Sequence, residues 1–172
     1  MLTKTVVLVV ALPCILLVLI LNRGFGFNDA DLQKLKTTNQ CPGCDLAGSY
    51  MTGSKLSSAN LAGANLSSAS VSNANLIATD LSNADLSNAN MTSSKLNEAR
   101  LIGAKLLGTI MTNASLQNAD LTNANLSGIV LWDANLSGAK LDGANLSGAK
   151  LGGATWMDGV KCREDSVGMC NK

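Results

Sequence analysis

The chain has 172 residues, a formal net charge of +1, no histidine and five aromatic residues (two Trp, one Tyr and two Phe). Histidine-based catalytic dyads and imidazole metal ligands are therefore excluded, because both need a ring nitrogen. The balanced charge and the few aromatic rings give no basis for nucleic-acid binding, which relies on cationic and stacking side chains. A core built on large aromatic side chains is also excluded.

The chain begins with a targeting segment. An apolar run covers residues 6–21, is interrupted only by Pro13 and is preceded by Lys4. This pattern is typical of a signal-peptide core or a short membrane anchor. We therefore assign residues 1–27 as a signal peptide or N-terminal anchor, and expect the rest to be exported. Cleavage and retention both stay open because no A-x-A cleavage motif is present. If the segment is not cleaved, residues 6–21 are expected to contact the membrane.

Residues 28–43 are expected to form a cap that contains a short helix and a CPGC turn. Asn28 or Asp29 is suited to the N-cap position, where a side-chain oxygen accepts from a backbone N–H. Leu32 and Leu35 form a short apolar stripe. Such a helix could lie across the first turn of the following domain and cover its open end.

A five-residue period dominates the next segment. From Leu46 to Trp156 a large apolar residue recurs at every fifth position for 23 consecutive units, and the unit reads A-N-L-S-G. A period of five fits neither an α-helix nor a straight strand, because the apolar residues would not stay on one face. The chain must therefore turn a corner once per unit, with the central residue and the preceding Ala pointing inward.

The number of sides of this coil follows from the exceptions to leucine. Between Leu46 and Leu151 the only central residues that are not Leu are Met51, Val71, Met91 and Met111, each 20 residues from the next. Twenty residues are four units, so the coil is predicted to have four sides. We call the side that carries these four residues, followed by Leu131 and Leu151, the Met face.

The A-(N/D)-L-x-x unit, repeated without a break of register, resembles the pentapeptide repeat family. The resemblance implies an all-β fold, a right-handed quadrilateral β-helix solenoid, over residues 44–158, with the short helix as an N-terminal cap. The CPGCDL start and the TWMDGVKC ending resemble small exported cyanobacterial members, which implies location in the thylakoid lumen or periplasm. The family resemblance implies no single function, because its members do many unrelated things.

The predicted core is a ladder of stacked leucines. Each central residue is expected to pack on the one 20 residues further along, and these contacts replace the missing aromatic side chains. One such ladder consists of Leu61, Leu81, Leu101, Leu121 and Leu141.

Four cysteines flank the repeats. Cys162 and Cys170 are expected to form a disulfide that closes the tail, residues 159–172, over the terminal coil. Cys41 and Cys44 are either a second disulfide or a thiol/disulfide redox motif. Cys44 occupies an inward-pointing position of the repeat, and no βαβ pattern surrounds it. Both observations favour structural cysteines over a redox motif. A four-cysteine zinc site is excluded because the pairs lie at opposite ends of the rod.

The outward positions offer one candidate interaction patch. Ile110, Val130 and Trp132 lie on or beside the Met face, with Leu107 at the adjoining corner, at positions usually filled by polar residues. Such a cluster indicates an interface with an unknown protein partner or with a second copy of the chain. The repeats carry six acidic and six basic residues, so a nucleic-acid mimic, which needs a strongly acidic face, is excluded.

The sequence therefore predicts a non-enzymatic exported scaffold with a structural or protein-binding role and no cofactor or metal. A redox protein that uses the CPGC motif is the alternative. Ice or mineral binding is disfavoured because the threonine column of the Met face, which includes Thr52, Thr92 and Thr112, is interrupted by Ser72 and Trp132.

Overall fold

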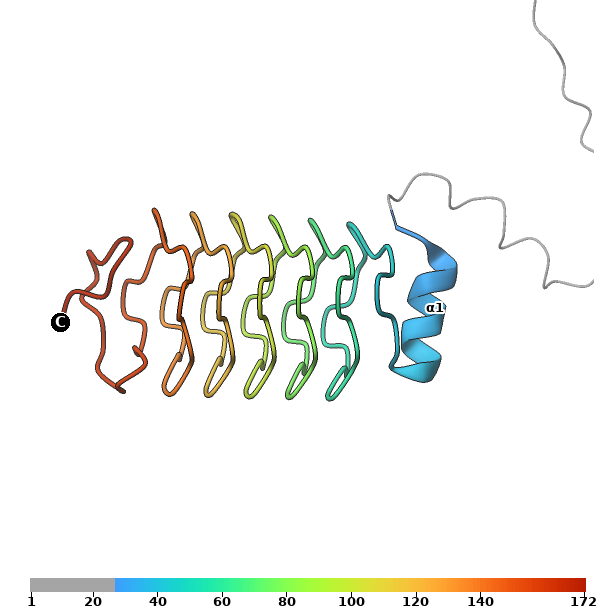
Figure 1. Cartoon of the computed structure of the whole chain (residues 1–172), viewed down its shortest axis with the longest axis horizontal. Helices are drawn as coiled ribbons and strands as arrows, with labels where there is room; N and C mark the ends of the chain where they lie inside the picture. Colours follow the sequence, from blue (N-terminus) through green and yellow to red (C-terminus); the bar gives the residue numbers. More distant parts are fainter. Residues whose placement is uncertain (1–26) are drawn as a thin grey trace, which may run out of the picture.

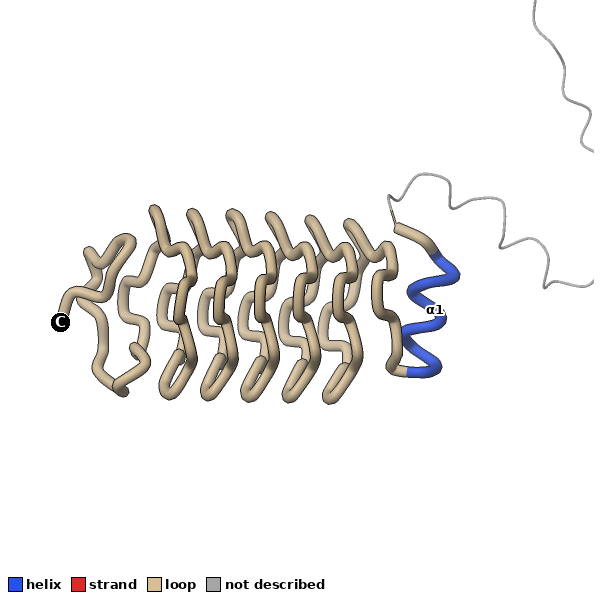
Figure 2. The backbone as a smooth tube through the Cα atoms, in the orientation of Figure 1, coloured by secondary structure: helices blue, strands red, loops and turns tan. Residues whose placement is uncertain are grey.

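The computed structural model describes residues 27–172 and shows a rod of stacked coils between one helix and a C-terminal tail (Figure 1). The helix α1 covers Asp29–Thr38 and is the one regular element of this part of the chain (Figure 2). No helix within residues 27–172 is long and apolar enough to cross a membrane. The apolar run 6–21, and with it the predicted signal or anchor, lies outside the described residues.

Helix α1 begins and ends at capping asparagines. The Asn28 side chain accepts a hydrogen bond from the N–H of Ala30 at 3.0 Å, which satisfies a donor that the helix itself leaves free. Asn39 adopts the left-handed conformation with φ of 57° and donates its backbone N–H to the carbonyl of Leu35. The predicted helix and its N-cap are thus confirmed.

The helix is fixed onto the first coil by both apolar and polar contacts. Leu32 and Leu35 are buried, with 7% and 1% of their surface exposed. The Asp31 carboxylate accepts from the backbone N–H of Asp45 at 2.8 Å, and the N–H of Asn28 donates to the carbonyl of Asp45 at 3.0 Å. The end of the solenoid is covered here, as the apolar stripe predicts.

The coil has the four sides that the sequence predicts. Parallel bridges join residues 20 positions apart, as between Asp80 and Arg100, from Gln40↔Asn60 to Asn135↔Thr155. On that side the N–H of Leu81 donates to the carbonyl of Arg100 at 2.7 Å. Because each side contributes a single residue to each bridge, the ladders stay isolated bridges and no extended strand forms within residues 27–172 (Figure 2).

Each corner is a four-residue turn. The N–H of Ala84 donates to the carbonyl of Leu81 at 3.0 Å, and Asn83, in the third position of the turn, has φ of 58°. This is the geometry of a type II turn, which favours Gly or Asn at that position. The five-residue unit is therefore one short side plus one turn.

The core consists of the central residues and the small residues two positions before them. In the predicted ladder Leu61, Leu81, Leu101 and Leu121 are at most 1% exposed, whereas Leu141 is only partly buried. Leu141 departs from the prediction because it belongs to the last coil. No further repeat lies above it, and the tail passes over other sides of that coil.

The tail reverses direction after Trp156 and runs back over part of the last coil. The N–H of Cys162 donates to the carbonyl of Ala154 at 2.8 Å, and the N–H of Leu151 donates to the carbonyl of Ser166 at 2.9 Å. Residues 161–168 therefore lie antiparallel to residues 149–155, with bridges Thr155↔Lys161 and Lys150↔Val167.

Candidate interaction surface

The outward residues of the Met face form one continuous column. Parallel bridges connect Tyr50 to Ser70, Asn90 to Ile110, Ile110 to Val130 and Val130 to Lys150. Ile110 and Val130 are thus direct cross-strand neighbours on adjacent coils. Two β-branched side chains in such a pair contact each other on the outer surface of the sheet.

Three of the four predicted patch residues are strongly exposed. Leu107 is 49%, Trp132 48% and Ile110 42% exposed, while Val130 is half-buried. Leu107 precedes Ile110 in the same coil, and Trp132 follows Val130 in the next one. The structure pairs Ile110 with Val130 and places Leu107 in the corner before this side of the coil and Trp132 in the corner after it. We call Leu107, Ile110, Val130 and Trp132 the apolar patch.

Lysine 150 completes the patch on the side of the tail. Its ammonium nitrogen lies 5.6 Å from the centre of the Trp132 ring, which is a cation–π distance. The contact places a positive charge at the edge of the apolar patch.

Val167 is a neighbour of the patch that the sequence reasoning missed. It is 58% exposed and pairs in antiparallel fashion with Lys150, so the tail extends the column of the Met face by one apolar residue. The five-residue period ends before the tail and gave no register for Val167. The spacing between the two C-terminal cysteines was the only signal that the tail turns back.

The position occupied by Ile110 and Val130 has a clear structural task elsewhere in the solenoid. Between residues 45 and 145, every Asn or Asp directly before a central residue accepts a hydrogen bond from the backbone N–H two residues later. These Asx turns satisfy a donor of the corner. The preference for Asn and Asp at this position therefore reflects turn stabilisation as well as solvation.

Ile110 and Val130 cannot make this bond. Within residues 27–172 the N–H groups of Thr112 and Trp132, which follow them by two positions, have no acceptor. Lys and Arg at the same position also lack the bond, but their charged ends are solvated or paired. The side chains of Ile110 and Val130 make no such hydrogen bond and have no charged end to be solvated or paired. Turn formation and solubility therefore do not explain Ile110 and Val130.

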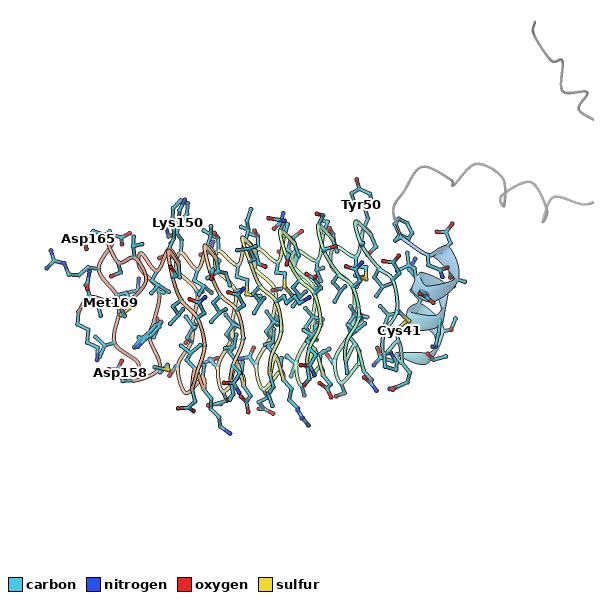
Figure 3. The ribbon with its side chains drawn as sticks, turned by 45° about the horizontal axis from the view of Figure 1, so that its top comes forward. Cys41, Tyr50, Lys150, Asp158, Asp165 and Met169 are labelled. Carbon is cyan, nitrogen blue, oxygen red and sulfur yellow. A yellow bond between two sulfur atoms is a disulfide. The ribbon has the colours of Figure 1, made fainter. Side chains whose placement is uncertain are left out.

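Tyr50 shares the column but not the patch. It is 69% exposed and lies at the α1 end of the rod, whereas Lys150 lies near the tail (Figure 3). Ser70 and Asn90 separate Tyr50 from Ile110 along the bridges. The apolar patch is consequently confined to the C-terminal half of the Met face.

Both cysteine pairs are joined in disulfides, Cys41 to Cys44 and Cys162 to Cys170. Cys41 is fully buried and Cys44 is 4% exposed, under helix α1. An Asp31 oxygen and the two sulfurs lie within 4.8 Å of one another. Bonded sulfurs offer no thiolate, so this cluster forms no metal site while the disulfide is intact.

The outer surface also carries ion pairs between neighbouring coils. Lys140 lies 3.9 Å from Asp120, and Lys105 lies 3.9 Å from Asp85. The hydroxyl of Thr122 donates to the Asp120 carboxylate at 2.6 Å. This bond lowers the pKa of Asp120 below its ordinary value of 3.8. Partial burial opposes the shift, and Lys140 adds to it.

The comparisons identify the class of solenoid that this geometry defines. The family model described as pentapeptide repeats matches residues 41–73, 69–108, 94–133 and 119–155, with 8 copies. These stretches together cover more than half of the chain, and the chain belongs to the pentapeptide repeat family. Its fold is accordingly the right-handed quadrilateral β-helix. Comparison with curated protein sequences finds no match.

Among solved structures the chain is similar to HetL of the cyanobacterium Nostoc sp. strain PCC 7120, a protein involved in heterocyst differentiation regulation. The identity is 34% and the TM-score 0.51, over 71% of this chain and 63% of HetL. The chain thus spans less than two thirds of the length of HetL.

Two further similar structures are pentapeptide repeat proteins with lower TM-scores. One comes from the thylakoid lumen of Arabidopsis thaliana, with 27% identity, 76% of this chain and 73% of that chain covered, and a TM-score of 0.46. The other comes from the cyanobacterium Cyanothece 51142, with 30% identity, 74% and 97% covered, and a TM-score of 0.37.

Proposed function

We propose that the chain is a non-enzymatic scaffold that docks a partner protein through the apolar patch. The observation that carries this proposal is the exposure of Ile110 and Trp132, at 42% and 48%, at positions where the repeat elsewhere places polar residues. Exposed apolar side chains clustered on a rigid wall are typical of the centre of a small interface.

The chemistry of the patch indicates what the partner offers. A flat apolar surface would cover Ile110 and Val130, and a carboxylate beside it would face the ammonium of Lys150. The cation–π contact, worth about 0.5 to 1 kcal/mol at an exposed site, favours one arrangement of Lys150 and Trp132 before binding. Because side chains that are ordered before binding lose less entropy on binding, this arrangement favours a specific contact.

The redox alternative has less support. A thiol/disulfide exchange requires a thiolate to reach a sulfur of Cys41 or Cys44, and both residues are at most 4% exposed under α1. Exchange would therefore need the helix to detach first. A disulfide-exchange assay on the folded protein tests this: turnover of a dithiol substrate without unfolding would favour the redox function.

Export to the thylakoid lumen or periplasm is part of the proposal. The apolar run 6–21 after Lys4 supports it, and two disulfides suit an oxidising compartment. Fractionation of the native host is the test. Recovery of the soluble protein in the cytoplasm with residues 1–27 intact would contradict export.

The docking proposal is tested by site-specific crosslinking in the native host. Benzoylphenylalanine replaces Trp132 in one variant and Ile102 in a matched control, because Ile102 holds the same position of its unit on the opposite side of the coil. We expect one identified protein to crosslink at position 132 and not at position 102. Equal capture at both positions would contradict docking through the patch.

The partner identified in this way is then tested for co-purification with a chain that carries the changes Ile110→Asn, Val130→Asn and Trp132→Ser and no crosslinker. The expected result is loss of the identified partner with an unchanged circular dichroism spectrum. Ile102→Ser serves as the matched control and should keep the partner. A triple variant that keeps the partner would show that the patch has no role in docking.

A further inference from the structure

The last coil of the solenoid is covered on only two of its four sides. Its sides lie at residues 139–141, 144–146, 149–151 and 154–156. The tail pairs with the last two, where Ala149, Leu151 and Ala154 are fully buried. On the first two sides, Leu141, Ala144 and Leu146 are only partly buried. The tail thus stands on one half of the rod end, at the opposite end from α1 (Figure 1).

The uncovered half also has free backbone groups. Within the part of the chain that the structure describes, the N–H groups of Leu141, Gly143, Leu146 and Gly148 have no acceptor. In every preceding coil the corresponding groups donate to the next coil, as the N–H of Leu121 does to the carbonyl of Lys140 at 2.8 Å. An open edge of this kind pairs readily with another chain.

The tail presents apolar side chains that its own chain leaves exposed. Met169 is 65% and Val160 45% exposed, and Met169 lies in the tail at the very end of the rod (Figure 3). The disulfide between Cys162 and Cys170 holds the segment that carries Met169 against the rest of the tail. A rigid apolar projection therefore stands beside a partly apolar recess.

The projecting tail and the uncovered half of the last coil are arranged in a way that suits two-fold symmetry. Around the coil, the two open sides 139–141 and 144–146 are followed by the two covered sides 149–151 and 154–156. A two-fold axis perpendicular to the rod that passes between side 144–146 and side 149–151 exchanges the open half with the covered half. Each tail would then lie over the open half of the other copy, and both copies would use the same surface in one isologous interface.

Charges at the rim are compatible with this arrangement. Lys140 and Asp142 flank Leu141 on the open half, and the tail carries Arg163, Glu164 and Asp165. Both signs occur on both halves, so each half can place opposite charges against the other. A partner of single-sign charge would gain less from this rim.

We infer that the C-terminal end is a self-association surface on which two copies join end to end, each tail covering the open sides 139–141 and 144–146 of the other. Self-association of this kind is independent of partner docking through the apolar patch, because it involves the C-terminal end of the rod and a second copy of the chain. It predicts an elongated dimer in which both helices α1 lie at the outer ends.

The test uses the full chain in mild detergent, so that residues 1–27 are the same in every sample. Sedimentation over a range of protein concentrations should show a dimer, and X-ray scattering should give a maximum dimension close to twice that of the monomer. The variant Val160→Asp with Met169→Asp places two charges on exposed tail positions. It should weaken dimerisation at least about tenfold with no loss of folded structure.

A second variant addresses the recess instead of the projection. Ala144→Arg adds a bulky charge to the open half and should also weaken dimerisation, with folding monitored by circular dichroism. Tyr50→Ser, an exposed change at the other end, is the control and should leave the dimer intact.

The outcomes separate this inference from the docking proposal. A wild-type chain that stays monomeric at concentrations up to about 100 µM would overturn the inference. A dimer that survives both C-terminal variants would overturn it as well. If the triple change in the apolar patch abolishes the dimer and the C-terminal changes do not, self-association occurs through the Met face.

Discussion

At the scale of single residues, three positions of the five-residue unit have distinct physical tasks. The central residue fills the interior, the preceding Asn or Asp accepts the N–H of the next corner, and the third residue of the turn adopts a positive φ. Apolar periodicity predicted the first task from the sequence. The second was not predictable from apolar periodicity, because the Asx bond depends on the exact path of the corner.

Leu101→Asp is expected to abolish folding. The side chain is fully buried between Leu81 and Leu121, and a carboxylate there would have no partner, which destabilises a domain by several kcal/mol. Thermal melting followed by circular dichroism measures the effect. Leu101→Met is the matched control and should cost less than about 1.5 kcal/mol, because its volume is similar. An equal melting temperature for Leu101→Asp and wild type would refute the inward assignment.

Asp120 is expected to stabilise the fold only above its folded pKa. Because that pKa is lowered by the Thr122 hydroxyl and by Lys140, the folded state favours the charged carboxylate. The contribution is present above the unfolded value and is lost as the pH falls through the folded pKa. Asp120→Asn should therefore lower the melting temperature at pH 6 to 7 more than at pH 3. A pH-independent difference would contradict the shift.

The triple change in the apolar patch should not destabilise the fold. The changes place asparagine at position 130, directly before Leu131, and serine at position 132. This repeats the arrangement at Asn125, where Ser127 donates its N–H at 3.1 Å and its hydroxyl at 2.6 Å. Each restored backbone bond contributes about 0.5 to 1.5 kcal/mol. These gains offset the lost contacts between Ile110 and Val130 and between Trp132 and Lys150.

Thermal melting therefore distinguishes a functional patch from a structural one. We expect the triple variant to melt at the wild-type temperature or above it while losing its partner. A fall in melting temperature larger than about 4 °C, which corresponds to roughly 1 kcal/mol for a small domain, would show that the patch contributes to folding instead.

At the scale of elements, the cap and the tail were predictable to different degrees. Capping residues and the Leu32 and Leu35 stripe predicted α1 as a cover. The tail has no period and no capping signal, so the sequence indicated only its closure by Cys162 and Cys170. Its antiparallel path, the position of Val167 on the Met face and the exposure of Leu141 depend on where the chain reverses after Trp156.

Reduction of the tail disulfide should loosen the tail without unfolding the repeats. The bond closes a loop with a sequence separation of 8 residues, and its removal destabilises the closed tail by roughly 2 to 3 kcal/mol. In a Cys162→Ser, Cys170→Ser variant, hydrogen exchange should accelerate at position 162, Leu151 and Gly168, whose N–H groups join the tail to the last coil. Exchange at Leu81 and Leu101 should stay slow. Uniform acceleration along the rod would mean that the tail is required for the whole fold.

At the scale of the whole molecule, the solenoid is a stack in which each coil contacts only its neighbours. The period of five and the spacing of 20 between exceptions were sufficient to predict this architecture, because they state directly how the chain turns and how coils align. They do not predict which side of the coil binds a partner, because the stacking is equally stable whichever residues point outward. The site had to be identified from outward residues that contribute nothing to stacking.

Two deletions of equal length test this separation of fold from function. Removing residues 81–100 or residues 101–120 takes out one complete coil, so every remaining column keeps its alignment and the shortened rod should fold in both cases. Both variants should melt below wild type by a similar amount, because each loses one set of stacked central residues. Only the second deletion removes Leu107 and Ile110, and it joins Asn90 directly to Val130 on the Met face. We therefore expect the 81–100 deletion to keep the crosslink at position 132 and the 101–120 deletion to lose it. If both deletions fold and both keep the partner, the binding surface lies elsewhere on the rod.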